Sequence, residues 1–310
     1  MSRRGHKNHL CSSLSICGSR NFPDLYRHLA VQRPGLFLLL LSVTALSAAV
    51  AVRAESGPAL RERLHGPRAG AHAGGIWRIA PDTLQRFTAV YEAGVDIVGT
   101  DLRLSWDGVP VVYHDETLDR RTWCGGPVSD KTVAELQQCR FKLGRGRIPT
   151  LEEVLQWSAG KVVIDAEPKE VDAIEPAVAL VQRYGAHGWV YLEAKSDPER
   201  YRRARAADPR VALSFKVESE AALEWAVGLH DDHLVIIELP MEMCRASVIE
   251  RVRSAGKVPL VNAFQHGRLG ELFGAQCGWA YDRGIGIAIS DRPASCAAQR
   301  DHARDAGTSE

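Results

Sequence analysis

The feature that most constrains the fold is a regular alternation of short apolar runs and amphipathic stretches, which begins at about residue 66. Apolar runs such as VVID at 162–165 and VIIE at 235–238 are short enough for buried strands, and stretches with helical spacing of apolar residues follow them. This alternation predicts parallel strands joined by crossover helices. About eight such units in roughly 230 residues suit a single closed (β/α)8 TIM-type barrel of the α/β class.

A doubly wound open sheet is the alternative architecture for such an alternation. Sheets of that kind that bind dinucleotides carry a G-x-G-x-x-G turn after the first strand, whereas this chain has HAGGIWR at 72–78. Within the barrel, the run VPVVYH at 109–114 is expected to form a ribbon with the strand VDIVGTDLRL at 95–104. A helix is expected over 83–93, and SDKTVAELQQC at 129–139 begins with Ser/Asp N-cap chemistry.

A second local signal is TLEEVLQWS, in which Thr150 and Glu153 have the spacing of a capping box at the start of a helix.

The N-terminal region differs from the rest of the chain. Residues 34–52 carry no charge, Arg33 precedes them, and small residues up to Ala54 offer a cleavage position. This is the pattern of a signal peptide, although the apolar run is also nearly long enough to remain as a membrane anchor. The protein is therefore expected to be secreted or periplasmic, and membrane association through 34–52 is possible only if this segment is retained.

The expected domain organisation follows from these two regions. It consists of an N-terminal extension with the signal peptide or anchor at 1–54, the barrel at 55–295, and a flexible tail at 296–310.

Composition narrows the classes of partner and the redox state. The formal net charge is only +1, so no overall field attracts nucleic acid. Five of the seven cysteines follow the apolar run, and an odd number leaves at least one free or intermolecular. Cys124 and Cys139 flank one loop and could form a disulfide outside the cytoplasm, but burial of all five as small apolar side chains is equally compatible. No cysteine spacing indicates zinc.

Polar residues gather at the predicted carboxyl ends of the strands, where TIM barrels place their active sites. They are His72, Asp101, His114, Asp115, Glu167, Lys169, Glu193, Lys195, Lys216, Glu238, Asn262 and Asp291. Histidines can exchange protons with a reacting group, carboxylates can hold a hard divalent cation, and lysine can bind a phosphate oxygen. Each residue also has an ordinary structural explanation, as a hydrogen-bonded histidine, a turn cap or a rim ion pair.

Several of these motifs together resemble one enzyme family. AHAGG, DGVPVVYHDETLDR, IPTLEEVL, DAEPK and ISDRP occur in the order found in glycerophosphodiester phosphodiesterases, which belong to the phosphatidylinositol-phospholipase-C-like superfamily. The resemblance extends from about residue 70 to residue 293. It implies a lipid- and glycerol-metabolism hydrolase with a TIM barrel, whose small-molecule partner is a glycerophosphodiester or a lipid headgroup.

The resemblance also implies roles for particular residues. His72 and His114 correspond to the two catalytic histidines, Asp101 and Glu167 to ligands of a divalent cation (Ca²⁺ or Mg²⁺), and Lys169 to a phosphate-binding lysine. In the family, one histidine acts as base and the other as acid. The neighbouring glycerol hydroxyl attacks phosphorus, and water then opens the cyclic phosphate to give glycerol 3-phosphate and an alcohol.

Three positions depart from the family pattern. Ala73 replaces the usual arginine after the first histidine, and PDT replaces ENT, so that a carboxylate is lost or displaced onto Asp82. The third departure is Gly99, which stands where the family's Glu-x-Asp places a second carboxylate beside Asp101. Residues two apart on a strand face the same side, and calcium or magnesium takes several oxygen ligands. Gly99 therefore weakens the predicted cation site.

Three outcomes are open at this site. Another carboxylate, such as Glu193 or Glu238, completes the coordination, or the cation binds weakly with more water, or the protein works without a metal. In the last case the guanidinium of Arg103, on the same face as Asp101, could stand beside the phosphate, as in metal-independent bacterial phospholipases C of this superfamily. The alternatives to a glycerophosphodiester hydrolase are a weakened or inactive barrel that binds phosphodiesters or lipid headgroups, and a metal-independent phospholipase-C-like enzyme.

Overall fold

The computed structural model describes residues 57–72, 79–265 and 276–307. The apolar segment 34–52 lies outside the described residues, and the signal peptide or anchor expected there therefore stays a prediction. Over the described ranges, no helix has the length and apolar character that crossing a membrane requires.

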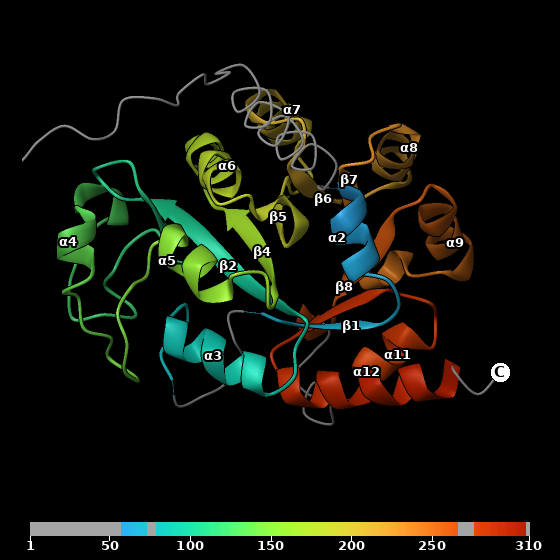
Figure 1. Ribbon diagram of the computed structural model, residues 1–310, viewed down its shortest axis with the longest axis horizontal. Helices are drawn as coiled ribbons and strands as arrows, with labels where there is room; N and C mark the ends of the chain where they lie inside the picture. Colours follow the sequence, from blue (N-terminus) through green and yellow to red (C-terminus); the bar gives the residue numbers. More distant parts are fainter. Residues whose placement is uncertain (1–56, 73–78, 266–275, 308–310) are drawn as a thin grey trace, which may run out of the picture. The chain divides into compact units, whose positions relative to one another are not determined.

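Eight parallel strands form the centre of the molecule (Figure 1). They are β1 (Arg68–Ala71), β2 (Ile97–Leu104), β4 (Val163–Pro168), β5 (Val190–Glu193), β6 (Ala212–Lys216), β7 (Leu234–Glu238), β8 (Val258–Asn262) and β9 (Ile287–Ser290). β1 pairs with both β2 and β9, so the sheet closes on itself. The predicted (β/α)8 barrel is confirmed, and the open-sheet alternative is wrong. β3 (Pro110–Val112) pairs antiparallel with β2, as the predicted ribbon requires.

Helices follow the strands in sequence and cover the outside of the barrel. They are α3 (Leu84–Glu92), α5 (Leu151–Ser158), α6 (Ile174–Arg183), α7 (Pro198–Ala207), α8 (Glu220–Gly228), α9 (Ala246–Ser254), α11 (Gln276–Tyr281) and α12 (Pro293–Gly307). The predicted capping box of α5 is present, with Thr150 and Glu153 each bonding the other's backbone N–H. The short helix α4 (Val133–Leu136) is capped by Thr132 and Glu135 rather than by the serine and aspartate before them.

The helix α2 (Gly57–Arg63) closes the amino-terminal end of the barrel. Leu60 and Leu64 are fully buried among residues that begin strands, including Ile97 of β2 and Ile287 of β9. Burying a leucine side chain contributes about 1.5–3 kcal/mol, so this plug also stabilises the domain. Because one end of the barrel is filled with apolar side chains, polar chemistry is confined to the other end.

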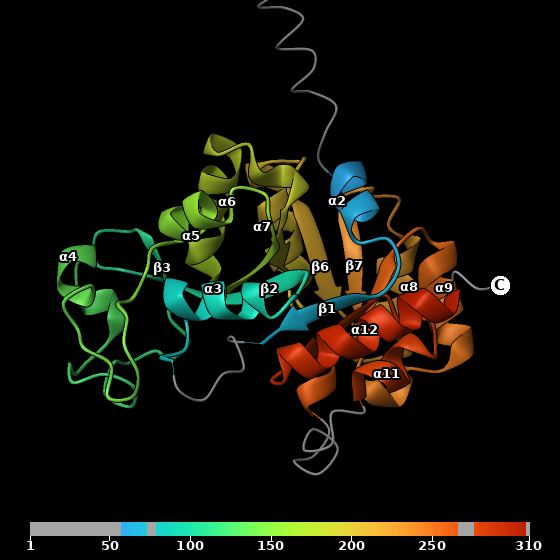
Figure 2. The same ribbon diagram turned by 60° about the horizontal axis from the view of Figure 1, so that its bottom comes forward.

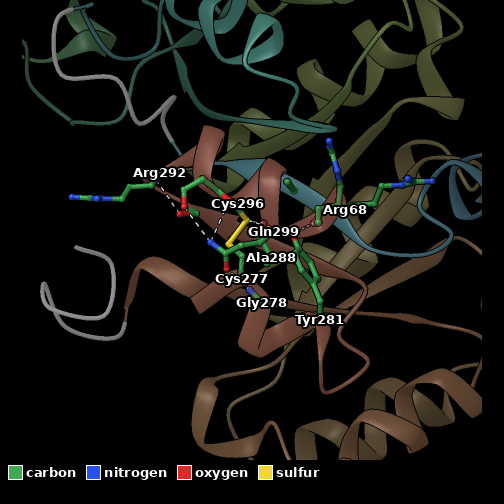
Figure 3. Close-up of a disulfide and its surroundings, with 12 residues drawn as sticks. Arg68, Cys277, Gly278, Tyr281, Ala288, Arg292, Cys296 and Gln299 are labelled. Carbon is green, nitrogen blue, oxygen red and sulfur yellow. Dashed lines mark hydrogen bonds between the residues drawn. A yellow bond between two sulfur atoms is a disulfide. The ribbon is translucent and has the colours of Figure 1, made fainter. Parts of the chain in front are cut away.

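A disulfide between Cys277 and Cys296 joins α11 to α12 beneath the closing strands (Figure 3). The hydroxyl of Tyr281, in the last residue of α11, donates to the backbone carbonyl of Arg68 at the start of β1, 3.1 Å away. This last helical pair therefore contacts the first strand of the barrel and helps to hold the sheet closed.

The flexible tail was predicted for residues 296–310, but residues 296–307 are helical. Residues 293–307 form α12, which packs against β1 and β9 (Figures 1 and 2). Arg300 and Arg304 both pair with Asp96, at 2.5 and 3.2 Å. The sequence of this helix is rich in small and charged residues and shows little apolar periodicity, so its anchors are visible only in the folded chain.

The chain between β3 and α5 forms a small lobe on one side of the barrel, around α4 (Figure 2). It has its own apolar core, which includes Leu118, Leu136 and Ile148. The disulfide considered for Cys124 and Cys139 is present in this lobe, with Cα atoms 5.6 Å apart. Cys244 is the free, buried cysteine among the described residues, in agreement with the odd count.

Candidate active site

A polar pocket of about 210 Å³ opens at the carboxyl ends of the barrel strands. It is lined by His72, Gly99, Thr100, Asp101, Asp165, Glu167, Lys169, Glu193, Lys195, Lys216, Glu238, Asn262, Phe264 and Ile289. Strand register explains this gathering, because Asp101 of β2 pairs directly with Glu167 of β4, and Lys216 of β6 with Glu238 of β7. The predicted residues His72, Asp101, Glu167 and Lys169 therefore share one pocket.

His72 follows β1 and lies at the edge of this pocket. Its Nδ1 atom is 2.9 Å from Oδ1 of Asp291, and its ring stacks on Phe264 with 3.9 Å between centroids. Because a carboxylate accepts the proton of Nδ1, Nε2 is the nitrogen left for a substrate. Burial opposes the charged imidazole, but Asp291, with Asp101 nearby, outweighs it and raises the pKa of His72.

His114 follows β3 and has a similar arrangement. Its Nδ1 atom lies 2.9 Å from Oδ1 of Asp115, which leaves Nε2 free in the same way. Two arginines hold that carboxylate: Arg120 Nε at 2.8 Å and Arg121 Nε at 3.2 Å. Although burial acts in the opposite direction, hydrogen bonds from Arg120 and His114 lower the pKa of Asp115 to about 2.

The two histidine–aspartate pairs occupy neighbouring positions rather than one cavity. His72 lines the polar pocket, whereas His114 is not among the described residues that line it. Arg121, which contacts Asp115, also donates from Nη1 to Oδ2 of the buried Asp82 at 2.8 Å, and it lines a neighbouring groove together with His72 and Asp291. The sequence predicted both histidines on one rim. In the structure, Arg121 contacts the aspartate of the second pair and borders the same groove as the first pair.

Asp82 and Asp165 are two buried carboxyl groups whose pKa values are raised. Burial and the nearby Asp101 raise the pKa of Asp82 to about 7 despite its contact with Arg121. Burial raises the pKa of Asp165, which pairs in register with Gly99, to about 7 as well. The sequence had assigned a displaced carboxylate to Asp82, but it offered no signal for Asp165.

Lysine side chains occupy the space between the two predicted metal ligands. Nζ of Lys169 lies 2.6 Å from Oδ1 of Asp101 and 2.5 Å from Oε1 of Glu167. Nζ of Lys195 contacts the same Glu167 oxygen. Burial disfavours the charge on Lys169, yet Asp101 and Glu167 outweigh burial and raise its pKa. Glu193-x-Lys195, at the end of the next strand, repeats the spacing of Glu167-x-Lys169. This repetition is the sequence pattern that indicates a second lysine at the pocket.

The donor set around this pocket does not match a divalent cation. Among the described residues, no three histidine, cysteine or acidic side chains come together in a way that could ligate one ion. Of the predicted substitutes, Glu238 is buried and Glu193 is half-buried, and desolvation raises the pKa of each. Glu238 instead accepts a hydrogen bond of 2.7 Å from Asn262. A raised pKa disfavours the charged carboxylate form that binds Ca²⁺ or Mg²⁺.

Arg103, predicted as a substitute for the cation, has a different place in the structure. Its Nη1 atom donates to Oε2 of Glu170 at 2.9 Å, and its Nε and Nη2 atoms donate to the backbone carbonyl of His114. It does not line the polar pocket within the described residues. The prediction of a substrate-binding Arg103 therefore lacks structural support, and the contacts instead make it a residue that positions the His114 loop.

The fold and the site together define a TIM barrel with a polar pocket that is lined by His72, carboxylates and lysines. Residues 72–219 match the model of the "Glycerophosphoryl diester phosphodiesterase family". The resemblance recognised from the sequence is confirmed for residues 72–219, which are similar to this family.

Curated relatives agree with this assignment. The chain is 31% identical over 163 residues to "Probable glycerophosphodiester phosphodiesterase 2" of Mycobacterium tuberculosis, which is 52% of this chain and 60% of that protein. It is 34% identical over 115 residues to a glycerophosphodiester phosphodiesterase of Caldanaerobacter subterraneus, covering 35% and 47%. A lysophospholipase D of Homo sapiens is 25% identical over 174 residues, covering 50% and 54%. The matches thus span about half the length of these relatives.

Solved structures support the fold. A glycerophosphoryl diester phosphodiesterase from Parabacteroides distasonis superposes with a TM-score of 0.69 at 21% identity, covering 80% of this chain and 92% of that one. A phosphodiesterase from Oleispira antarctica, solved with the product sn-glycerol-3-phosphate, has a TM-score of 0.63 at 22% identity, covering 76% and 97%.

Proposed function

We propose that the protein hydrolyses glycerophosphodiesters to glycerol 3-phosphate and an alcohol. The observation that carries this proposal is the pair of histidines, His72 and His114, each with Nδ1 held by an aspartate. His72 lines the lysine-containing polar pocket, and His114 follows β3 outside that lining. The family match and the product in the Oleispira antarctica structure support this class of substrate.

In the proposed first step, the glycerol hydroxyl next to the phosphodiester attacks phosphorus. A P–O bond forms to that oxygen, and the P–O bond to the departing alcohol breaks. Nε2 of one histidine takes the hydroxyl proton, and the imidazolium of the other donates a proton to the departing oxygen. Water then opens the cyclic phosphate with the two roles reversed. Asp291 and Asp115 orient the rings of His72 and His114 and stabilise their charged forms.

The family resemblance also implies a divalent cation, Ca²⁺ or Mg²⁺, at Asp101 and Glu167. The two carboxylates are neighbours in strand register, but Lys169 bonds both of them and Gly99 removes the third ligand. Because this donor set does not match the cation, the scheme above uses only side chains of the chain.

We further propose that the protein acts in the periplasm or outside the cell. The disulfides Cys124–Cys139 and Cys277–Cys296 support an oxidising compartment. The apolar segment 34–52 supports export, either as a cleaved signal or as a retained anchor.

The experiment is a turnover assay with glycerophosphocholine and glycerophosphoethanolamine, in which glycerol 3-phosphate is measured. We expect His72→Ala and His114→Ala each to lower kcat by about 10²–10⁴-fold, the usual contribution of a general acid or base. His65→Ala, an exposed histidine at the opposite end of the barrel, is the matched control. Turnover that survives both active-site substitutions would refute the two-histidine mechanism.

Gly99 favours one competing function, a barrel that binds phosphodiesters without cleaving them. Calorimetric binding of glycerophosphocholine in the absence of turnover, with calcium, magnesium or manganese present or absent, would support that function. Turnover of either substrate would exclude it.

A further inference from the structure

The strongest unassigned feature is the cluster of ammonium groups in the polar pocket. Lys169 bonds Asp101 and Glu167, the two residues to which the family resemblance assigns a metal. Lys195 adds a second ammonium to Glu167. Two carboxylates thus face two cationic side chains, and a divalent ion at this point would have to displace both.

Lys195 is held in an uncommon backbone conformation. Its φ is +55°, in the left-handed region that non-glycine residues rarely adopt. Its carbonyl accepts a hydrogen bond of 2.9 Å from the backbone N–H of Lys216, which ties the turn to β6. Strain of this kind persists where the surrounding structure fixes it, and it gathers at functional sites. Here it directs the side chain of Lys195, which is 38% exposed, to the mouth of the pocket.

We propose that the ammonium groups of Lys169 and Lys195 take the place of the divalent cation, with Lys195 binding a phosphate oxygen in the transition state. The proposal rests on the proposed function and deepens it. A lysine ammonium is a compact point charge with three donors, so it can bond a carboxylate and a phosphate oxygen together. It neutralises phosphoryl charge without altering the proton transfers of the two histidines.

The first test is turnover of glycerophosphocholine by full-length protein that has been dialysed against chelator. We expect kcat/KM to be unchanged by the chelator and by added Ca²⁺, Mg²⁺ or Mn²⁺. Loss of activity on chelation, with recovery on adding one of these ions, would overturn the proposal.

The second test addresses Lys195 itself. We expect Lys195→Met to lower kcat by about 10²-fold, the usual effect of removing one donor to a developing oxyanion. Lys195→Arg should recover part of the loss because it keeps the charge. Lys161→Met is the matched control. Lys161 lies before the amino-terminal end of β4, whereas the pocket is at the carboxyl ends of the strands. Full activity of Lys195→Met, with an unchanged melting temperature, would refute the assignment.

The two proposals fail in different ways. If the wild type turns over no glycerophosphodiester, the proposed function fails and the cation replacement is judged by binding. Calorimetry with glycerol 3-phosphate in chelator should then show binding by the wild type that Lys195→Met weakens at least tenfold, and equal affinities would overturn the role of Lys195.

Discussion

Replacing Asp291 by asparagine tests how the site controls His72. Asp291 Oδ1 is 2.9 Å from Nδ1 of His72 and stabilises the imidazolium through a hydrogen bond and its charge. A hydrogen bond to a charged group contributes about 1.5–3 kcal/mol, and the half-exposed position of Asp291 reduces this to about 1–2 kcal/mol. That energy corresponds to about a 5–30-fold loss in kcat.

The pH dependence provides a sharper readout than the rate alone. Because Asp291 raises the pKa of His72, its removal lowers that pKa, and the limb of the pH–rate profile due to His72 should move to lower pH. The assay is kcat/KM for glycerophosphocholine between about pH 5 and pH 9, where histidine titrates. Asp282→Asn, at an exposed position, is the control. A lower rate with both limbs unmoved would refute the reasoning, because it would mean that Asp291 acts only on folding.

Three further predictions concern the second disulfide, the ion pairs of Asp115 and the position of the His114 loop. Removing the second disulfide with Cys277→Ser and Cys296→Ser should lower the free energy of unfolding by about 2–4 kcal/mol, measured by urea denaturation beside a reduced wild-type sample. The folded structure holds the pKa of Asp115 at about 2, below the value in the unfolded chain. Its ion pairs therefore stabilise the fold at pH values above the unfolded pKa, and this stabilisation is lost as the pH falls toward 2. Asp115→Asn should therefore cost about 1–2 kcal/mol at pH 7 and little near pH 2, and an equal loss at both pH values would contradict this. Arg103→Met, which frees the carbonyl of His114, should lower kcat more than it raises KM, and Glu170→Gln should act in the same direction but less. A change in KM alone would contradict this positioning role.

The periodicity of the chain was sufficient to predict the barrel. Parallel strands with crossover helices have few closed solutions, and local signals such as the capping box of Thr150 and Glu153 depend only on nearby residues. The final helix could not be predicted in this way. Its stability comes from the ion pairs of Arg300 and Arg304 with Asp96, and from a disulfide, all of which join distant parts of the chain.

The candidate active site likewise has features that the sequence predicts and features that depend on the tertiary structure. The sequence alone determined which residues stand at the ends of the strands. It also predicted that His72, Asp101 and Lys169 lie together, because the carboxyl ends of all strands meet at one end of a barrel. Only the tertiary structure decided how those residues are used. Asp291 bonds His72 across 219 positions of the sequence, and Lys195, in the strained turn after β5, contacts Glu167 of the neighbouring strand. Contacts of this kind depend on the register and twist of the closed sheet, which no local pattern encodes.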